Sequence, residues 1–364
     1  MYFDNNATAL LDPRVKGAIQ AALEHSFGNP SSAHAFGQAA KSAISEARRQ
    51  IASYFKVKQS QIIFTSGGSE GAYLCIRGLI GTHGSIISSK IEHACVLETL
   101  EALNQKIVYL PVGLSGAIDP QDLKDSITSE TKGIVLMAAN NETGVMQDLY
   151  AISAIAEHCS IPLIVDAVSY LGKEKMKIPS GVTALFFSGH KIHALQGSGF
   201  ICLKARNKLI PQITGGSQEF GLRGGTENLL GIIALSKAIQ ILEKEEDKAI
   251  SHMRSMRDRL EKELLNLPGV KQNGTGPRIC NTTNLSFGKW DGESLLIALD
   301  QTGRAVSLGS ACSSGAIEPS RVLLSMGVPL AEARASLRFS LSRLNTMEEI
   351  EKALSIIKKI YLRQ

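Results

Sequence analysis

Paired cysteines are absent from this sequence. Its six cysteines are scattered, with no Cys-x-x-Cys pair and no regular spacing; they are Cys75, Cys95, Cys159, Cys202, Cys280 and Cys312. This arrangement argues against a zinc ribbon and against a disulfide framework, and it is typical of a protein from a reducing compartment.

Long apolar runs and targeting signals are missing as well. No apolar stretch approaches the roughly 20 residues that a membrane-spanning helix needs. Residues 1–6 lack the charged start and the apolar stretch of a signal peptide. The sequence therefore predicts a cytoplasmic protein with no membrane segment.

Neither sign of charge dominates. The net charge is only +5 over 364 residues, and no basic run is interleaved with aromatic residues, so nothing supports direct binding of nucleic acid. A hydrophobic content of 44% and a charged content of 20% are those of a globular protein. The length predicts about two domains.

Short apolar runs alternate with amphipathic stretches through most of the chain. Strands are predicted at 61–64, 85–88, 106–109, 133–137, 161–165, 184–187 and 199–203. Pro13 and Pro120, each after an aspartate, mark predicted helix starts. This alternation favours a mostly parallel sheet covered by helices on both faces. The last two strands are an exception, because too few residues separate them for a helix.

A second, smaller unit follows a long predicted helix over 228–267. After Pro268-Gly269 the pattern changes to α+β, with strands at 281–287 and 337–341, a helix at 292–299 and a terminal helix from Met347. We expect a large domain over 13–255, and a small domain formed by 1–12 together with 256–364.

Two ionisable residues follow buried strands. Asp166 ends the apolar run 161–165, and Lys191 comes soon after the run 184–187. Pyridoxal 5′-phosphate requires such a pair, since the amine forms a Schiff base and the carboxylate keeps the pyridine nitrogen protonated. An ordinary ion pair at a sheet edge is the alternative, and these two residues alone do not separate the two interpretations.

Two glycine-rich loops are candidates for phosphate binding. Thr65-Ser-Gly-Gly-Ser-Glu70 follows a strand and opens a helix, so free amides and the hydroxyls of Ser66 or Ser69 can cradle a phosphate. It is no Walker A loop, because no Gly-Lys-Thr/Ser follows. The loop 215–226 is rich in glycine but lacks the strand context of a dinucleotide fingerprint.

The histidines allow more than one interpretation. His93, after Glu92, is either a packed or capping residue or a ring that stacks on a cofactor. His190 and His193 lie three apart, but no Glu, Asp or Cys stands at ligand spacing, so no metal site is predicted.

Cys312 lies in Gly309-Ser-Ala-Cys-Ser-Ser314, among glycine and serine instead of apolar residues. Such a thiol is a candidate nucleophile, on a loop that can change its conformation at little energetic cost. Arg338 stands inside an apolar strand, which suggests either a clamp for a carboxylate or an internal salt bridge.

In these features the chain resembles the cysteine desulfurases of the NifS/IscS type, which are class-V aminotransferases of the aspartate-aminotransferase superfamily. The resemblance runs nearly end to end. The matching motifs are Phe3–Thr8, Phe27–Ser32, Phe64–Glu70, Glu92-His93, Asn140–Gly144, Asp166-Ala167, Ser188–Lys191, Gly225–Asn228, Gly309–Ser314 and Arg338–Ser340.

The resemblance implies an α/β protein with the fold type I of pyridoxal-phosphate-dependent transferases, whose large domain holds a mainly parallel seven-stranded sheet. It also implies a homodimer that converts L-cysteine to L-alanine and forms a persulfide on Cys312. The motif around Cys312 resembles the branch with a long mobile loop, which donates sulfur to an iron–sulfur scaffold or a tRNA-thiolation carrier.

Each matching residue acquires an implied role. Lys191 forms the Schiff base and later moves the substrate's α-proton, Asp166 pairs with the pyridine nitrogen, and His93 stacks on the ring and carries protons. The implied phosphate-binding residues are Gly68, Ser69, Ser188, His190 and, from a second subunit, Thr226. Asn141 is implied to contact both cofactor and substrate, and Arg338 to bind the substrate carboxylate.

Two positions depart from the family's usual pattern. Ser169 stands where a glutamine usually bonds the cofactor's phenolic oxygen, so a bridging water is expected there. Ser69 replaces a commoner threonine and keeps the hydroxyl. The alternatives are a selenocysteine lyase, another pyridoxal-phosphate-dependent lyase or aminotransferase, and a non-catalytic relative that serves as a scaffold.

Overall fold

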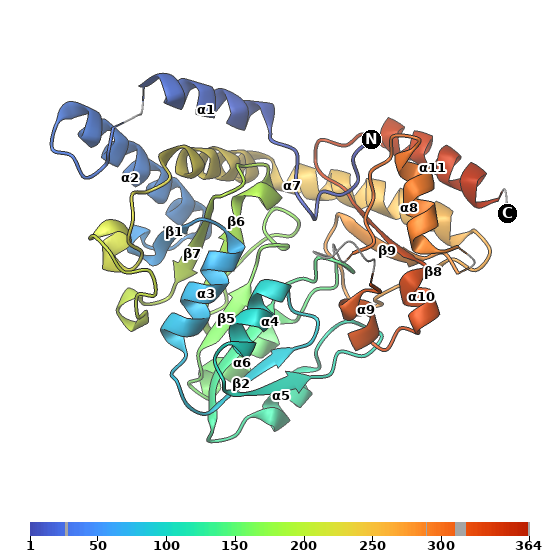
Figure 1. Cartoon of the computed structure of the whole chain (residues 1–364), viewed down its shortest axis with the longest axis horizontal. Coiled ribbons are helices and arrows are strands. Elements are labelled where there is room, and N and C mark those ends of the chain that lie inside the picture. The colour runs from blue at the N-terminus through green and yellow to red at the C-terminus, as the bar shows by residue number, and fades with distance from the viewer. Residues whose placement is uncertain (26–27, 289, 310–317, 363–364) are drawn as a thin grey trace.

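The computed structural model describes residues 1–25, 28–288, 290–309 and 318–362 (Figure 1). Cys312 lies outside these residues. A seven-stranded sheet forms the larger part of the fold, in the order β1-β7-β6-β5-β4-β2-β3. Its strands are β1 Ile62–Thr65, β2 Ser85–Ser89, β3 Lys106–Leu110, β4 Thr131–Met137, β5 Leu163–Asp166, β6 Val182–Ser188 and β7 Gly199–Leu203.

The sheet is mainly parallel, as predicted. Strands β3, β2, β4, β5 and β6 pair in parallel along the sheet, while β7 runs antiparallel to both β6 and β1. The short connection between β6 and β7 explains this reversal, because a parallel crossover needs a dozen or more residues.

Helices cover both faces of this sheet (Figure 1). The helices are α1 Pro13–His25, α2 Ala35–Phe55, α3 Gly68–Leu79, α4 Ala94–Glu101, α5 Pro120–Ser126, α6 Leu149–His158 and α7 Leu229–Leu265. Successive strand residues point to opposite faces, so Ile134 and Leu136 pack with α2, α6 and α7, whereas Val135 packs with α3 and α4. The starts predicted at Pro13 and Pro120 are confirmed.

The smaller unit has its own core. Its antiparallel sheet has the order β10-β9-β8, and its elements are β8 Lys271–Gln272, β9 Thr282–Ser286, β10 Ser336–Ser340, α8 Gly292–Asp300, α9 Arg321–Ser325, α10 Leu330–Arg334 and α11 Met347–Tyr361. Phe3, Leu285 and Phe339 are buried together in this core. Four 3₁₀ turns complete the described elements: η1 Gln59–Gln61, η2 Gly189–Ile192, η3 Arg206–Lys208 and η4 Gln218–Gly221.

Helix α7 passes from one core to the other. Residues from Ile232 to Leu242 are buried with the large sheet, and residues from Ala249 to Leu264 with the small one. The predicted boundary at 255 falls inside this helix, and the division into 13–255 and the remainder stays a prediction. At the N-terminus the chain meets both units, because Ser340 N donates to Phe3 O (2.7 Å) and Ala9 N to His190 O (2.9 Å).

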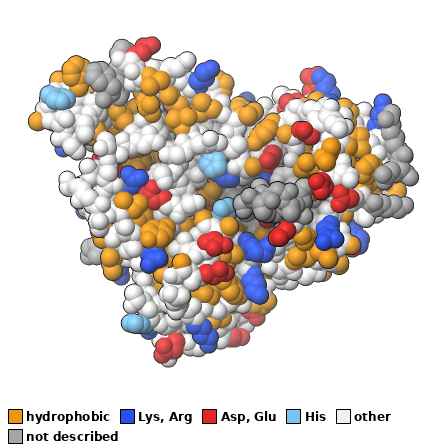
Figure 2. Space-filling model, viewed as in Figure 1, with side chains coloured by type: hydrophobic (Ala, Val, Ile, Leu, Met, Phe, Trp, Pro, Cys, Tyr) orange, Lys and Arg blue, Asp and Glu red, His pale blue; other side chains and the backbone are white. Residues whose placement is uncertain are grey.

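Figure 2 shows acidic and basic side chains interspersed on the face in view. Within the described part of the chain, no helix has both the length and the apolar composition needed to span a membrane.

Candidate active site

The candidate residues converge at the carboxyl ends of the parallel strands. Strand β5 ends at Asp166, β6 leads through Ser188 to Lys191, β2 leads to His93, and β4 leads to the turn with Asn141. Ligands of open α/β sheets bind outside this edge, which explains why residues far apart in the chain meet there.

Lys191 lies in the 3₁₀ turn η2 and makes no ion pair with Asp166. Its Nζ donates to the carbonyl oxygens of Asn6 and of Ala7, the latter at 2.8 Å. Burial, and then the positive charge of Arg338, lowers the pKa of Lys191 to about 8. The geometry therefore does not support the alternative of an ordinary Asp–Lys ion pair.

Asp166 is buried at the end of β5, where Val168 N donates to its Oδ1 at 2.9 Å. Burial raises its pKa to about 6, although the Val168 amide and the charge of Lys191 oppose this rise. Among the described residues its Oδ2 has no hydrogen-bond donor. One oxygen is thus available to a protonated ring nitrogen.

His93 is the N-cap of α4, where its Nδ1 accepts from Cys95 N at 3.2 Å. His93 therefore caps the helix through Nδ1, and its Nε2 remains available for proton transfer. Loss of contact with water, and then the charges of Lys191 and Arg321, lowers the pKa of His93. The ring is neutral at neutral pH and can exchange a proton.

The glycines of the loop between β1 and α3 allow another group to approach its backbone closely. Gly67 has φ +156° and ψ −170°, a region that only glycine occupies readily. A Cβ on Gly68 would lie 3.0 Å from Val168 Cγ2, and α3 begins without a side-chain cap. Ser69 is exposed at this helix start, and Ser188 is close enough that a Cβ on Gly67 would lie 3.6 Å from its Oγ.

The loop that carries Thr226 is tied to the same helix. Arg223 binds Glu70 of α3 through Nε (2.8 Å) and Nη2 (3.2 Å). Thr226 lines a hollow of about 70 Å³ together with Thr65 and Ser66. The structure thus brings Thr226 beside the phosphate loop of its own chain, and its predicted reach into a second subunit stays a prediction.

Asn140 and Asn141 make different contacts. The Asn140 side chain holds the turn, since its Oδ1 accepts from the amides of Glu142 and Thr143, both at 2.9 Å. The Asn141 carbonyl accepts from Asn6 Nδ2 (2.9 Å) and from Arg338 Nη1 (3.1 Å).

Arg338 also forms the internal salt bridge that the sequence left open, with Asp4 at 2.6 Å. Its buried Nε has no partner among the described residues. A donor is therefore left over for a substrate carboxylate, although the guanidinium is already partly engaged.

Sequence reasoning assigned no role to the individual residues of the N-terminal segment. Besides the carbonyls under Lys191, this segment provides Asp4 to Arg338, and Thr8 Oγ1 lies 3.2 Å from His190 Nδ1. Only the family motif over residues 3–8 indicated that this segment belongs to the site. Every residue has a backbone carbonyl, so the residue type does not show which carbonyl will accept a hydrogen bond. Buried Lys173 was also missed; its Nζ donates to Lys191 O at 2.6 Å.

One further position bears on the site. Ser169 is half-buried in the turn after β5. Of the residues that the structure describes, no three or more His, Cys, Asp or Glu side chains gather in a group able to hold a metal ion.

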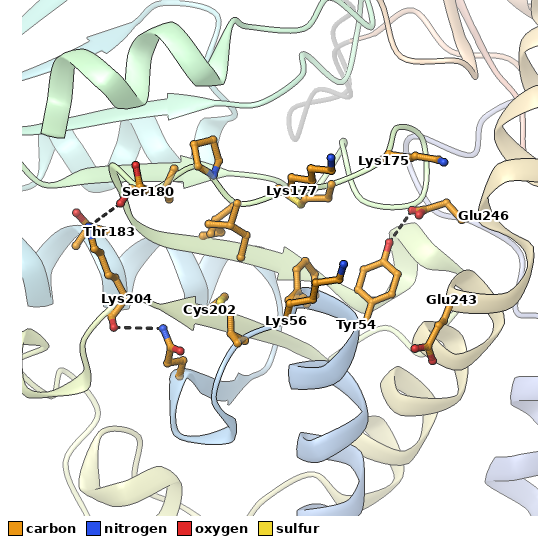
Figure 3. Close-up of a pocket in the computed structure, with 18 of the residues that line it drawn as sticks. Tyr54, Lys56, Lys175, Lys177, Ser180, Thr183, Cys202, Lys204, Glu243 and Glu246 are labelled. Carbon is orange, nitrogen blue, oxygen red and sulfur yellow. Dashed lines mark hydrogen bonds between the residues drawn. The ribbon is translucent and has the colours of Figure 1, made fainter.

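A spacious hollow of about 760 Å³ lies elsewhere (Figure 3). It is near the start of β6, at the opposite edge of the sheet, and its wall includes Tyr54, whose hydroxyl donates to Glu246 at 2.6 Å. Neither Lys191, Asp166 nor His93 lines it. Size alone therefore does not identify the site.

Comparisons with known proteins agree with this geometry. The family profile of class-V aminotransferases matches residues 1–353. The chain is 40% identical to "Cysteine desulfurase IscS" of Dictyoglomus turgidum, over 99% of this chain and 94% of that protein. It is 38% identical to "Cysteine desulfurase 2" of Trichormus variabilis (99% and 92%), and 36% identical to "Cysteine desulfurase IscS" of Methanosarcina thermophila (99% and 91%).

Solved structures are similar throughout. A structure titled "NIFS-LIKE PROTEIN" superposes with a TM-score of 0.93 at 32% identity and covers 100% of both chains. A NifS-like protein from Rickettsia africae gives a TM-score of 0.89 at 32% identity, over 99% of each chain. This chain belongs to the class-V aminotransferases, as a member of their NifS/IscS-like cysteine desulfurases, which are pyridoxal-phosphate-dependent enzymes.

Proposed function

We propose that this chain takes sulfur from L-cysteine, releases L-alanine and keeps the sulfur as a persulfide on Cys312. The observation that carries the proposal is the half-buried amine of Lys191, which interacts electrostatically with Asp166 without forming an ion pair with it. The reaction balances. The carbon–sulfur bond of the substrate cysteine breaks, and a bond forms between its sulfur and the sulfur of Cys312. The proton that the Cys312 thiol loses is matched by the one that the β-carbon of alanine gains.

The residues present fit pyridoxal phosphate. Lys191 would hold its aldehyde carbon, Asp166 its ring nitrogen and His93 its ring face. Gly68, Ser69, Ser188, His190 and the partner subunit's Thr226 would hold its phosphate, with Ser169 near its phenolic oxygen. When bound, pyridoxal phosphate acts as an electron sink for charge that develops on the substrate.

Proton transfer is assigned to Lys191 and His93. A pKa of about 8 lets the Lys191 amine exist without its charge near neutral pH, so it can take the α-proton of cysteine. His93 is neutral and has a free Nε2, which suits it to return a proton to the departing alanine.

Substrate orientation is assigned to Asn141 and Arg338. The guanidinium of Arg338 is buried and offers an unpartnered Nε to the substrate carboxylate. Its bond to the Asn141 carbonyl keeps the two residues together while the substrate is bound.

The persulfide is proposed to pass to an acceptor protein, either an iron–sulfur scaffold or a tRNA-thiolation carrier. A cytoplasmic homodimer is proposed with it. The resemblance of the Cys312 motif to the long-loop branch supports this proposal. The named relatives do not favour a selenocysteine lyase or a scaffold without activity.

The Cys312→Ala variant tests this function. With L-cysteine and a reducing thiol, the unaltered protein should release alanine and sulfide, and its Cys312 should gain the mass of one sulfur. The variant should keep the visible absorbance of its cofactor but lose the persulfide and nearly all alanine release. Unchanged alanine and sulfide release by Cys312→Ala would refute the assigned acceptor.

A further inference from the structure

In the sequence, Cys312 lies between Gly309 and Ser320. The structure describes both of these residues. We call Gly309 and Ser320 the two roots of the Cys312 segment. Both roots meet one oxygen atom. Ser320 Oγ donates to Oε2 of Glu142 at 2.5 Å. Gly309 approaches the same Oε2 so closely that a Cβ there would lie 2.5 Å from it.

The backbone conformation favours glycine at the first root. Gly309 has φ +95°, a conformation that L side chains rarely adopt, and its neighbouring space is filled by the Glu142 carboxyl. Ser320 is buried and caps α9, since its Oγ accepts from Leu323 N at 3.1 Å. The contact with Glu142 is thus made by backbone on one side and by a helix cap on the other.

Glu142 itself is held in place. It is buried, and burial raises its pKa. Its amide donates to Asn140 Oδ1 at 2.9 Å, and its carbonyl accepts from Asn284 Nδ2 at 3.3 Å. The residue before it is Asn141, so one ordered turn carries both the substrate contact and the contact with the two roots.

The two roots also reach other parts of the site. Ser307, just before Gly309, exchanges backbone hydrogen bonds with Arg338 at 3.2 and 2.7 Å. Arg321, just after Ser320, donates to the carbonyls of Lys90 and Glu92, the latter at 2.7 Å. The chain next to one root is therefore bonded to Arg338, and the chain next to the other is bonded to Glu92, the neighbour of His93.

We propose that Glu142 is a positioning residue for sulfur transfer: its carboxyl group accepts a hydrogen bond from Ser320 and packs against Gly309, on the turn that also carries Asn141. The inference rests on the proposed function, because what it positions is the segment that presents the Cys312 thiol to the substrate. Glu142 acts by fixing where the segment starts and ends.

The test separates sulfur transfer from substrate binding in the holoenzyme. One measurement is the rate at which Cys312 gains one sulfur after mixing with L-cysteine, followed by rapid quenching and mass spectrometry. The other is the change in cofactor absorbance when L-cysteine binds. The variants are Glu142→Ala, Glu142→Gln, Ser320→Ala and the double variant Glu142→Ala/Ser320→Ala.

Glu142→Ala should slow persulfide formation by about tenfold or more, because a misplacement of about 1 Å is enough for such a loss. The absorbance change should stay within about twofold of the unaltered protein. Glu142→Gln keeps an acceptor oxygen for Ser320 and should retain most of the rate. The double variant should lose no more than Glu142→Ala alone, since the two residues act through one contact.

Thr283→Ala is the matched control. Thr283 Oγ1 also donates at 2.5 Å to a buried glutamate, Glu261, whose other side-chain partner is Arg278 and neither root. The control should lose stability without slowing persulfide formation by more than about twofold.

The proposal is overturned if Ser320→Ala and Glu142→Ala both form persulfide within about twofold of the normal rate. It is also overturned if Glu142→Ala impairs the absorbance change as much as persulfide formation, since Glu142 would then only support Asn141. If Glu142→Ala fails to fold, Ser320→Ala decides by the same criterion. Failure of the proposed function looks different, because Cys312→Ala would then stay active.

Discussion

At the scale of the residue, the site depends on two ionisable side chains, half-buried Lys191 and buried Asp166, that form no ion pair with each other. Lys191 is bound to two carbonyl oxygens, and Asp166 to one amide. Burial without a paired charge favours the neutral form of each group, which moves the pKa of the amine down and that of the carboxyl up. The pKa values of both groups are thereby closer to neutral pH, where proton transfer is effective.

The first prediction concerns Lys191. When pyridoxal phosphate is added to cofactor-free protein, the rate at which the visible band appears should rise with pH through about 8, because only the uncharged amine is a nucleophile. An unperturbed lysine would place this rise near 10.4.

Lys173 is the matched control, because burial likewise lowers its pKa to about 8. Lys173→Met should still form the band, and Lys191→Ala should form none at any pH. A covalently bound cofactor in Lys191→Ala, detected after borohydride reduction, would contradict the assignment.

The second prediction concerns Glu92, which is buried with an unpartnered Oε2. Burial, and then the nearby charge of Asp166, raises its pKa to about 8, well above the 4.5 of an ordinary glutamate. Between these two values the unfolded chain has released a proton that the folded protein keeps, so stability falls as pH rises.

Urea unfolding of cofactor-free protein at pH 5 and pH 8 measures this effect. The unaltered protein should lose stability relative to Glu92→Gln by at most about 1.4 kcal/mol for each pH unit between those values. Exposed Glu98 on α4 serves as a control, and Glu98→Gln should follow the unaltered protein. An equal pH dependence in Glu92→Gln would show that Glu92 does not keep its proton.

At the scale of the element, α7 is the part that joins the two cores. Leu260 is fully buried in the small core, whereas Leu265 near the end of the same helix is 37% exposed. A substitution along this helix therefore reports how well each stretch is packed.

The third prediction is that Leu260→Ala lowers the free energy of unfolding by about 3 kcal/mol, since it removes apolar contacts and leaves a cavity. Leu265→Ala should cost less than about 1 kcal/mol, because its side chain keeps much of its contact with water. Equal losses, measured by denaturant unfolding, would mean that this end of α7 does not pack as described.

At the scale of the whole molecule, assembly into a dimer determines which chain supplies Thr226 to each site. The fourth prediction uses mixed dimers of Lys191→Ala and Thr226→Ala, separated by different affinity tags. If Thr226 acts across subunits, one of the two sites has both residues intact, and the dimer should show about half of the normal rate.

The same experiment has a clear opposite result. If Thr226 serves its own chain, no site in the mixed dimer is intact, and the rate should not exceed that of the Thr226→Ala homodimer. Size-exclusion chromatography of the unaltered protein over a range of concentrations tests the dimer itself.

Local patterns were enough for the sheet and for part of the site. The continuous apolar runs of β4, β5 and β6 are visible in short stretches of chain. Asp166 comes at the end of one such run, and Lys191 follows another within a few residues. A residue at a strand end is placed by the strand, so its neighbourhood follows from the order of the strands.

Contacts between distant parts of the chain were decided only by folding of the whole molecule. The carbonyls of Asn6 and Ala7 lie under Lys191, 185 and 184 positions away, and the Glu142 carboxyl meets Ser320 across 178 positions. Backbone atoms carry no side-chain signal, and a buried glutamate looks like any other glutamate until its neighbours are known. Such contacts arise where two cores pack together, and periodicity within a single element says nothing about that packing.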